Sequence, residues 1–390
     1  MGSREQFFER VDRIFDRNWL TNDGPLVKEF EAKIASFLNV RHCIATCSGT
    51  IALEIALRSL GLTGEVILPS YTFIATAHAL QWQGLTPVFA DIDPKTHNID
   101  PNSVRERISE RTSAILAVHL WGRGAPYEEL QAIACEHNIK LLFDAAHAFG
   151  CSLGGRKIGS FGACEVLSFH ATKFFNSFEG GAVVTNDDAL ATEVRLMRNF
   201  GFAGLDNVTS VGTNGKMPEV CAAMGLTNFD NIDTVIAANR ANYEAYRDGV
   251  SSIPGLTLCT YDEAEGNNFQ YIVIETDEQF PLKRDEAIQV LYAENINARR
   301  YFWPGCHSMQ PYKSMYPNAA QLLPRTVDVA NRVVVLPTGT AVSVEQVQQI
   351  VAILECIGRP ENADPIRDRL NKSLSFQFKQ AVKPDIRKAS

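Results

Sequence analysis

The chain has 390 residues, of which 45% are hydrophobic, and its formal charge at pH 7 is −8. This length predicts a large hydrophobic core and two domains, whereas the acidic charge argues against binding of duplex DNA. No segment reaches the roughly 18 to 20 apolar residues of a membrane-spanning helix, and the charged start MGSREQFFERVDRIF does not fit a secretion signal. The nine cysteines include no C-x-x-C pair, which favours a reducing cytoplasm over a disulfide framework or a zinc site.

Short β-rich runs alternate with helical patterns from about residue 28 to 235, which predicts an α/β architecture with a mainly parallel sheet. Several runs are apolar on both sides, as expected of strands that helices cover on two faces. Helical spacing of apolar residues predicts helices in TIALEIALRSLGL and APYEELQAIACEHN. The expected strands are HCIAT (42–46), EVILP (65–69), PVFAD (87–91), SAILAV (113–118), KLLFD (140–144), EVLSF (165–169) and GAVVT (181–185).

The pattern changes after about residue 235. A charged helix leads into NFQYIVIET, a helix near 284–294, RVVVLPT and a last helix at 343–357. We therefore expect residues 1–235 to form a large domain together with the N-terminal segment, and residues 236–358 to form a smaller α+β domain. Residues 359–390 are polar with scattered prolines, so we expect a tail that is weakly ordered or docked on the surface.

Residues that directly follow the expected strands are candidates for a binding site, because ligands of parallel sheets collect at the carboxyl ends of the strands. The first strand leads through CSGT (47–50) into a helix, so Ser48, Gly49 and Thr50 can offer hydroxyls and backbone N–H groups to a phosphate. An ordinary helix cap explains the same letters. Phe73, after the second strand, is either a ring facing the site or a core residue. Asp144 ends an apolar strand, where a buried carboxylate needs a cationic partner.

Lys173 lies five residues beyond Ser168, in SFHATKFFNSFEGG. No G-x-G-x-x-G follows the first strand and no P-loop motif occurs, so the dinucleotide fingerprint and the P-loop are both absent from the sequence. A phosphate-binding loop, an aromatic ring, a strand-end Asp and a downstream Lys together fit pyridoxal 5′-phosphate (PLP). This cofactor forms a Schiff base with a lysine and pairs its pyridinium nitrogen with an acidic residue. The combination is much more specific than any one of its members.

The order of several segments resembles the DegT/StrS group of nucleotide-sugar aminotransferases, which are PLP enzymes of fold type I with an aspartate-aminotransferase-like fold. The resemblance runs from about Trp19 to Gly339. Within the group, the chain looks most similar to the enzymes that form dTDP-4-amino-4,6-dideoxyglucose. The segments are GPLVKEFEAKIASFLNVRHCIATCSGTIALEIAL, LPSYTFIATAHAL, PVFADID, VHLWG, FDAAHAFG, SFHATK, EGGAVVT, GTNGKMPEVCAAMG and YFWPGCH.

The resemblance implies roles for individual residues. Lys173 corresponds to the Schiff-base lysine of the group, and Asp144 to the partner of the pyridine nitrogen. His147 corresponds to a residue near the ring hydroxyl, although a hydrogen-bonded structural histidine fits this position too. The remaining cofactor contacts that the resemblance implies are Gly49, Thr50 and the Ser168 hydroxyl at the phosphate, Phe73 stacked on the ring, and Asn214 reaching the phosphate of the neighbouring subunit in a homodimer.

Three further residues are assigned to the substrate by resemblance. Tyr301 and His307, in YFWPGCH, correspond to a C-terminal segment close to the nucleotide sugar, although an aromatic run also fits a core. Many members of the group have Gly-Glu-Gly-Gly after the lysine, and here Phe178 replaces the first glycine. Because the most similar subgroup shares this phenylalanine, we expect Phe178 to shape the sugar pocket.

The implied activity is transfer of the amino group of L-glutamate to a dTDP-4-keto-6-deoxyhexose, expected to be dTDP-4-keto-6-deoxy-D-glucose. The products are dTDP-4-amino-4,6-dideoxy-D-glucose and 2-oxoglutarate. Lys173 moves a proton in this scheme, and Asp144 keeps the pyridine nitrogen protonated. No metal, nucleic acid or membrane partner is expected. The sequence leaves open whether the end product is an antibiotic sugar or a surface polysaccharide such as an O-antigen.

Three alternatives accompany this interpretation. Amination at C3 of the sugar instead of C4 depends on a few pocket residues and stays open. Sugar 3-dehydratases of the same fold have histidine in place of the lysine, so Lys173 favours transamination. A non-catalytic regulatory protein of this fold usually carries a DNA-binding module, for which neither the short N-terminal segment nor the tail offers a basic recognition helix.

Overall fold

A computed structural model of the chain describes residues 2–381, and the chain divides into two compact units. Unit 1 contains the residues up to Arg240 together with Tyr261–Tyr271 and Phe302–Ala330. Unit 2 contains Ala241–Thr260, Ile272–Tyr301 and the residues from Asn331 onward. The division after Arg240 lies near the expected one after 235. The smaller unit differs from the continuous range 236–358, however, because two later segments pack with unit 1.

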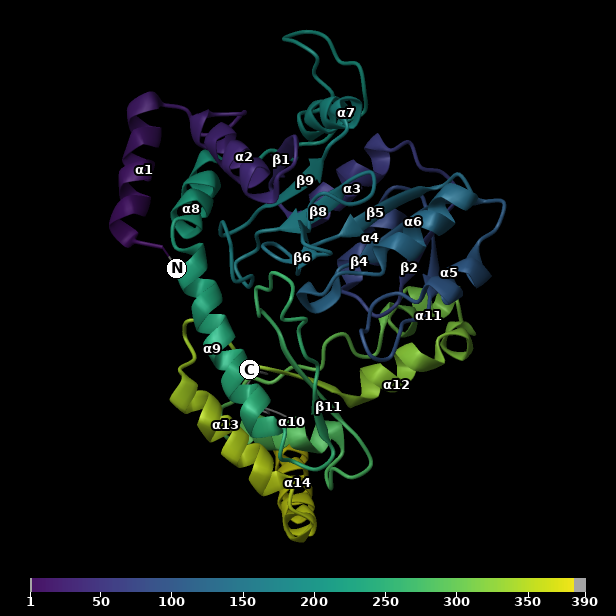
Figure 1. The fold of residues 1–390 in the computed structure, drawn as a ribbon, viewed down its shortest axis with the longest axis vertical. Helices are drawn as coiled ribbons and strands as arrows, with labels where there is room; N and C mark the ends of the chain where they lie inside the picture. The colour runs from purple at the N-terminus through teal and green to yellow at the C-terminus, as the bar shows by residue number, and fades with distance from the viewer. Residues whose placement is uncertain (1, 382–390) are drawn as a thin grey trace, which may run out of the picture. The chain divides into compact units, whose positions relative to one another are not determined.

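A seven-stranded sheet forms the centre of unit 1 (Figure 1). Its strand order is β1-β9-β8-β5-β4-β2-β3, and every neighbouring pair is parallel except that β9 runs antiparallel to β1 and β8. The predicted mainly parallel sheet is confirmed, with each strand within one residue of its expected bounds. The strands are β1 (His42–Thr46), β2 (Glu65–Pro69), β3 (Thr86–Ala90), β4 (Thr112–Val118), β5 (Lys140–Asp144), β8 (Glu165–Ser168) and β9 (Gly181–Thr185).

Helices flank this sheet, and their ends follow local chemistry. Ser48 caps α3, because its hydroxyl accepts a hydrogen bond from the Ile51 N–H at 3.2 Å. Asp187 caps α7 by accepting from Ala189 and Leu190. The helices that begin in unit 1 are α1 (Arg4–Arg17), α2 (Pro25–Leu38), α3 (Gly49–Ser59), α4 (Ile74–Trp82), α5 (Pro101–Arg107), α6 (Tyr127–Glu136), α7 (Asp188–Arg198), α8 (Glu219–Phe229), α9 (Ile232–Val250), α11 (Tyr312–Met315) and α12 (Pro324–Arg332).

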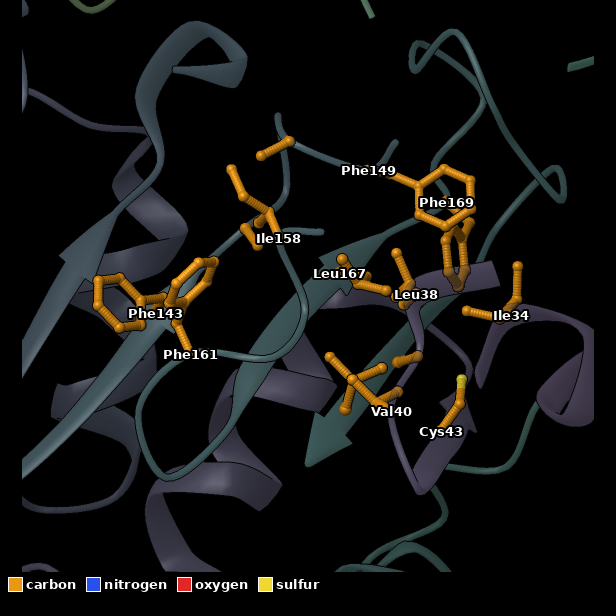
Figure 2. Packing of buried hydrophobic residues seen from close by; sticks show 14 of the residues in the cluster. Ile34, Leu38, Val40, Cys43, Phe143, Phe149, Ile158, Phe161, Leu167 and Phe169 are labelled. Carbon is orange, nitrogen blue, oxygen red and sulfur yellow. The ribbon is translucent and has the colours of Figure 1, made fainter. Parts of the chain in front are cut away.

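The core of unit 1 lies on both faces of the sheet. Successive strand residues alternate between two buried clusters, as the pleat of a strand requires: Leu142 belongs to one cluster, and Leu141 and Phe143 belong to the other. Figure 2 shows part of the second cluster, in which Leu167 of β8 lies among residues that include Phe149 and Phe169. The strands are therefore fixed by apolar packing on two sides, which makes their carboxyl ends a rigid base for a site.

Unit 2 is a small α+β unit, as predicted. Its antiparallel sheet has the order β10-β11-β12. The tail is helical as far as Ala381, and Arg367 in it donates a hydrogen bond to Glu286 at 3.2 Å, so the tail docks on unit 2. Residues 382–390 lie outside the described part of the chain. The elements are β10 (Leu256–Leu258), β11 (Ile272–Thr276), β12 (Val333–Leu336), α10 (Arg284–Ala293), α13 (Val344–Ile357) and α14 (Pro360–Ala381).

Short elements complete the chain. They are β6 (Ser152–Leu153), β7 (Arg156–Lys157) and three turns of 3₁₀ helix, at Leu120–Gly122, Cys306–Ser308 and Ala319–Leu322. Within residues 2–381, no helix combines the length and the apolar character that crossing a membrane requires.

Candidate active site

Asp144 lies at the carboxyl end of β5, near the middle of the sheet, and only 6% of its surface is exposed. Its Oδ2 accepts a hydrogen bond from the Thr76 hydroxyl at 2.8 Å, and its Oδ1 accepts one from the Ala146 N–H at 3.1 Å. Burial raises the pKa of Asp144, and the two hydrogen bonds and the charge of Lys173 oppose that rise. A carboxylate has about four lone-pair positions. Asp144 therefore keeps acceptor capacity for a pyridinium N–H, which would also stabilise its charged form.

The expected phosphate loop is brought against Ser168 by the strand register. Gly181 of β9 pairs with Thr46 of β1 on one side and with Ser168 of β8 on the other. A Cβ at Gly181 would lie 2.5 Å from the Gly49 nitrogen, and a Cβ at Gly49 would lie 3.0 Å from the Cβ of Ser168. A side chain is excluded at Gly181 and would be tightly packed at Gly49, because the N-terminus of α3 lies directly over the paired strands. The positive end of α3 and the Ser168 side chain thus form one cradle suited to a phosphate, in which Ser48 is the ordinary helix cap.

Lys173 lies in a closed loop between β8 and β9. The Phe169 N–H donates to the Gly180 carbonyl at 2.8 Å, and the Ser177 N–H donates to the Phe169 carbonyl at 2.9 Å, so the loop begins and ends at one place. The Lys173 Nζ donates to the hydroxyl of Tyr271 at 3.2 Å. Its charge acts on the pKa of both Asp144 and His147. The sequence prediction that these groups converge is consistent with this geometry.

His147 is buried beside Lys173 and is held as a neutral imidazole. Its Nδ1 accepts a hydrogen bond from the Trp121 N–H at 3.3 Å, which leaves the proton of the neutral ring on Nε2. Burial, and secondarily the charge of Lys173, holds the pKa of His147 well below its usual range. The backbone of Trp121 has a φ of 60°, an uncommon conformation for a bulky residue that here accompanies the Trp121 N–H bond to His147. His147 is therefore fixed as a donor through Nε2.

Three aromatic residues of this site were missed by sequence reasoning: Trp121, Tyr271 and Phe302. The rings of Trp121 and Phe302 are nearly parallel to the His147 ring, with centroids 5.9 Å and 5.7 Å from it. The Tyr271 ring lies 4.5 Å from that of His147, and burial raises the pKa of Tyr271, so its hydroxyl stays protonated. Trp121 stands in the recognised VHLWG segment. Tyr271 and Phe302 lie in stretches whose pattern indicated only a strand and an aromatic core.

Phe73 directly precedes α4 as its N-cap residue and is 56% exposed. Its ring contacts the ring of Phe302 edge-on, with 6.4 Å between the centroids. Because α4 also supplies Thr76, the same helix start carries a hydrogen-bond partner of Asp144 and an aromatic ring. An exposed ring at this place is available to stack on a planar ligand, as the resemblance implies.

His307 is fully enclosed in unit 1. Its Nδ1 lies 2.7 Å from the Ser70 hydroxyl, and its backbone N–H donates to the same oxygen at 3.0 Å. Burial lowers the pKa of His307, although the charge of Asp91 opposes that change. These Ser70–His307 hydrogen bonds connect the end of β2 to the segment that contains Phe302. The structure thus gives His307 a structural environment, and its contact with a nucleotide sugar stays a prediction.

The roles of the other sequence-predicted residues stay predictions. Asn214 is exposed and pairs with Asn199 in an isolated antiparallel bridge. Tyr301 belongs to unit 2, where its ring centroid lies 5.0 Å from the Arg299 guanidinium. Phe178 is 42% exposed, and its ring packs edge-on against Phe7 at 5.6 Å. Its φ of 62° explains why a glycine is common there, since a bulky residue in this conformation costs about 1–2 kcal/mol.

Comparison with known proteins tests the family that the sequence resembles. Residues 2–355 match the model of the DegT/DnrJ/EryC1/StrS aminotransferase family. The crystal structure of DesI in the presence of its TDP-sugar product superposes with a TM-score of 0.90 at 46% identity, covering 95% of this chain and 93% of DesI.

Two curated relatives are similar over most of their length. The dTDP-4-amino-4,6-dideoxy-D-glucose transaminase of Escherichia coli is 37% identical over 90% of this chain and 94% of the relative. The GDP-perosamine synthase of Vibrio cholerae is 30% identical over 87% and 93%, respectively. The aspartate-aminotransferase-like fold predicted from the sequence is thereby confirmed, and the chain belongs to the DegT/DnrJ/EryC1/StrS family of PLP-dependent sugar aminotransferases.

Proposed function

We propose that the chain transfers the amino group of L-glutamate to C4 of dTDP-4-keto-6-deoxy-D-glucose, giving dTDP-4-amino-4,6-dideoxy-D-glucose and 2-oxoglutarate. The observation that carries the proposal is the convergence of Lys173, Asp144 and the cradle at Gly49 and Ser168 in unit 1. The choice of sugar is supported by the similarity to the Escherichia coli transaminase and to DesI.

The side chains of the site have the chemical groups that PLP requires. Lys173 would hold the cofactor covalently, and Asp144 would pair with its pyridine nitrogen. Gly49, Thr50 and Ser168 would hold its phosphate at the N-terminus of α3, and Phe73 would stack on its ring. When bound, PLP supplies an electron-withdrawing ring and carries the amino group between the two substrates.

The side chains of the site then have separate tasks. With PLP bound, the amine of Lys173 would move a proton from the α-carbon of glutamate to C4′ of the cofactor, and the Tyr271 hydroxyl at 3.2 Å holds that amine in place. Asp144 keeps its negative charge opposite a positive ring nitrogen. His147 donates through Nε2 and stays neutral at physiological pH, so it orients an oxygen acceptor without adding a second cation beside Lys173.

We further propose that the enzyme is a cytoplasmic homodimer. The exposure of Asn214, which the family resemblance places at the phosphate of a neighbouring subunit, supports a shared site. The contacts of Tyr301, His307 and Phe178 with the nucleotide sugar belong to the same proposal.

One assay tests the substrate. Purified enzyme is incubated with glutamate and dTDP-4-keto-6-deoxyglucose, and NMR assigns the carbon that carries the new amine. We expect amination at C4. Amination at C3 would replace the proposed reaction by the alternative one, and no product with active, PLP-loaded enzyme would exclude this sugar. A parallel incubation with the GDP-linked 4-keto-6-deoxysugar tests the nucleotide, because a GDP-perosamine synthase is among the relatives.

A further inference from the structure

The N-terminal helix α1 lies beside α8 in unit 1 (Figure 1). Arg10 donates to the Thr227 hydroxyl at 3.0 Å and to the Asp230 carboxylate at 2.8 Å. Gly2 approaches α8 so closely that a Cβ there would lie 2.2 Å from the Thr227 carbonyl oxygen. The Gly2 N–H donates to the Asn228 side-chain oxygen at 2.8 Å. Helix α1 is therefore held against the end of α8 by Gly2, just before its first turn, and by Arg10, near its middle.

Asn228 connects this fastening to the loop of the catalytic lysine. Its amide is buried, and Nδ2 donates to the Asn176 carbonyl at 2.7 Å. Asn176 in turn donates from its own side chain to the Lys173 carbonyl at 3.4 Å. A continuous series of hydrogen bonds thus runs from Gly2 through Asn228 and Asn176 to the backbone of Lys173.

A second contact joins α1 to the same loop. The ring of Phe178 packs edge-on against Phe7 of α1, with an interplanar angle of 86°. Phe178 is held at a positive φ, and its N–H donates to the Asn176 side-chain oxygen at 3.4 Å. A phenylalanine keeps this conformation only if surrounding contacts favour it. The ring contact with Phe7 is such a contact.

We propose that Phe7, Asn228 and Phe178 are positioning residues that hold the Lys173 loop in its reactive geometry through α1. The proposal rests on the function proposed above. It gives Phe178 a role in holding the loop, in addition to the proposed contact with the sugar. It also explains how a loop with an exposed, conformationally strained phenylalanine presents its lysine in a fixed place, since misplacement of a reacting group by about 1 Å costs about 100-fold in rate.

The sharpest test changes one atom of Asn228. Asn228→Asp keeps the oxygen that accepts from the Gly2 N–H. It replaces the N–H donor to the Asn176 carbonyl by an oxygen, so that two acceptors repel each other. We expect kcat to fall about tenfold with the KM of both substrates unchanged, and hydrogen exchange in residues 169–180 to become faster. We also expect the visible absorbance to appear about tenfold more slowly when PLP is added to cofactor-free protein. Unchanged kcat and unchanged exchange would overturn the proposal.

The aromatic contact is tested from both sides. Phe7→Ala and Phe178→Gly should each reproduce the fall in kcat, and the double variant should be no worse than either single one, because both remove the same contact. Phe7→Leu should restore most of the activity. Phe15→Ala, on the same helix with its ring 67% exposed, is the matched control and should behave like the wild type. Additive losses in the double variant would contradict the shared role.

Two controls separate this proposal from other failures. Thermal unfolding identifies any variant that merely folds poorly. Phe178→Gly then remains decisive, because Phe178 is partly exposed and its replacement removes the ring and relaxes the backbone. The wild-type enzyme could bind PLP fully and protect the Lys173 loop from hydrogen exchange, yet be inactive on the proposed sugar. That result would contradict the substrate assignment alone. Active wild type with unaffected Asn228→Asp and Phe178→Gly variants would contradict the positioning role alone.

Discussion

The two charged groups at the centre of the site are held in contrasting ways. Asp144 is the last residue of a regular, buried strand, and the N–H of Ala146, two residues away, is one of its partners. Lys173 lies in a loop, and the hydroxyl it contacts belongs to Tyr271, 98 residues further along the chain. The backbone position of Asp144 follows from the sheet itself, although Thr76 of α4 also donates to its side chain, whereas the position of the Lys173 amine depends on a segment that is remote in sequence. Changes far from the site should therefore affect the lysine more than the aspartate.

The largest effect is expected at the lysine itself. Lys173→Ala removes the group that binds PLP covalently and moves the proton, so kcat should fall by about 10³-fold or more while some cofactor is still held noncovalently. Steady-state kinetics and borohydride treatment measure both properties, because borohydride should no longer fix the cofactor to the protein. Lys140→Ala, at the exposed start of β5, is the control and should be active. Wild-type turnover in Lys173→Ala would remove the lysine from its role.

Asp144→Asn should come next, with a loss in kcat of about 10²-fold and a smaller loss in PLP affinity.

The same variant also tests how the stability of the protein depends on Asp144. Burial raises the pKa of Asp144, so the folded, cofactor-free protein binds this proton more tightly than the unfolded chain does, and stability decreases as pH rises above the ordinary value of 3.8. Cofactor-free Asp144→Asn should thus be at least as stable as the wild type at pH 7. Thermal unfolding checks this, and a clear loss of stability would indicate a structural carboxylate.

Tyr271→Phe tests the remote support of the lysine. A hydrogen bond to a charged amine is worth about 1.5–3 kcal/mol, so we expect kcat to fall about 10- to 100-fold, with the overall fold intact. Tyr292→Phe changes an exposed tyrosine of unit 2 and should leave kcat as it is. If Tyr271→Phe matched the wild type, Lys173 would be held by its own loop and the contrast with Asp144 would disappear.

The smallest effect is expected at His147. Its folded pKa lies well below the ordinary 6.5, so the unfolded chain binds the extra proton and stability is lost as pH falls below about 6.5. His147→Gln removes that contribution. Between pH 7.5 and 5.5 the cofactor-free variant should lose about 1 kcal/mol less unfolding free energy than the wild type. Denaturant unfolding at the two pH values measures the difference, and an identical loss in both proteins would show that His147 is charged when folded.

The strands, the cradle and Asp144 were predictable from sequence because each depends on local pattern: apolar runs, a glycine before a helix, and an acidic residue at a strand end. Tyr271 and Phe302 were not, because nothing near them marks a chemical role. Their place follows from long-range packing that brings two later segments into unit 1. Phe178 shows a third case. The family resemblance implied a place in the sugar pocket, which stays a prediction, whereas its positive φ and its contact with Phe7 are visible only in the structure.

The assembly of unit 1 from three separate stretches of chain has a practical consequence for protein engineering. A fragment ending at Arg240 would keep the entire seven-stranded sheet but would lack Tyr271 and Phe302, which lie in Tyr261–Tyr271 and Phe302–Ala330. Chimaeras of two relatives are often made with a single crossover. A crossover after Arg240 would combine Lys173 from one parent with Tyr271 and Phe302 from the other. Recombination that keeps the three stretches together preserves the contacts within unit 1.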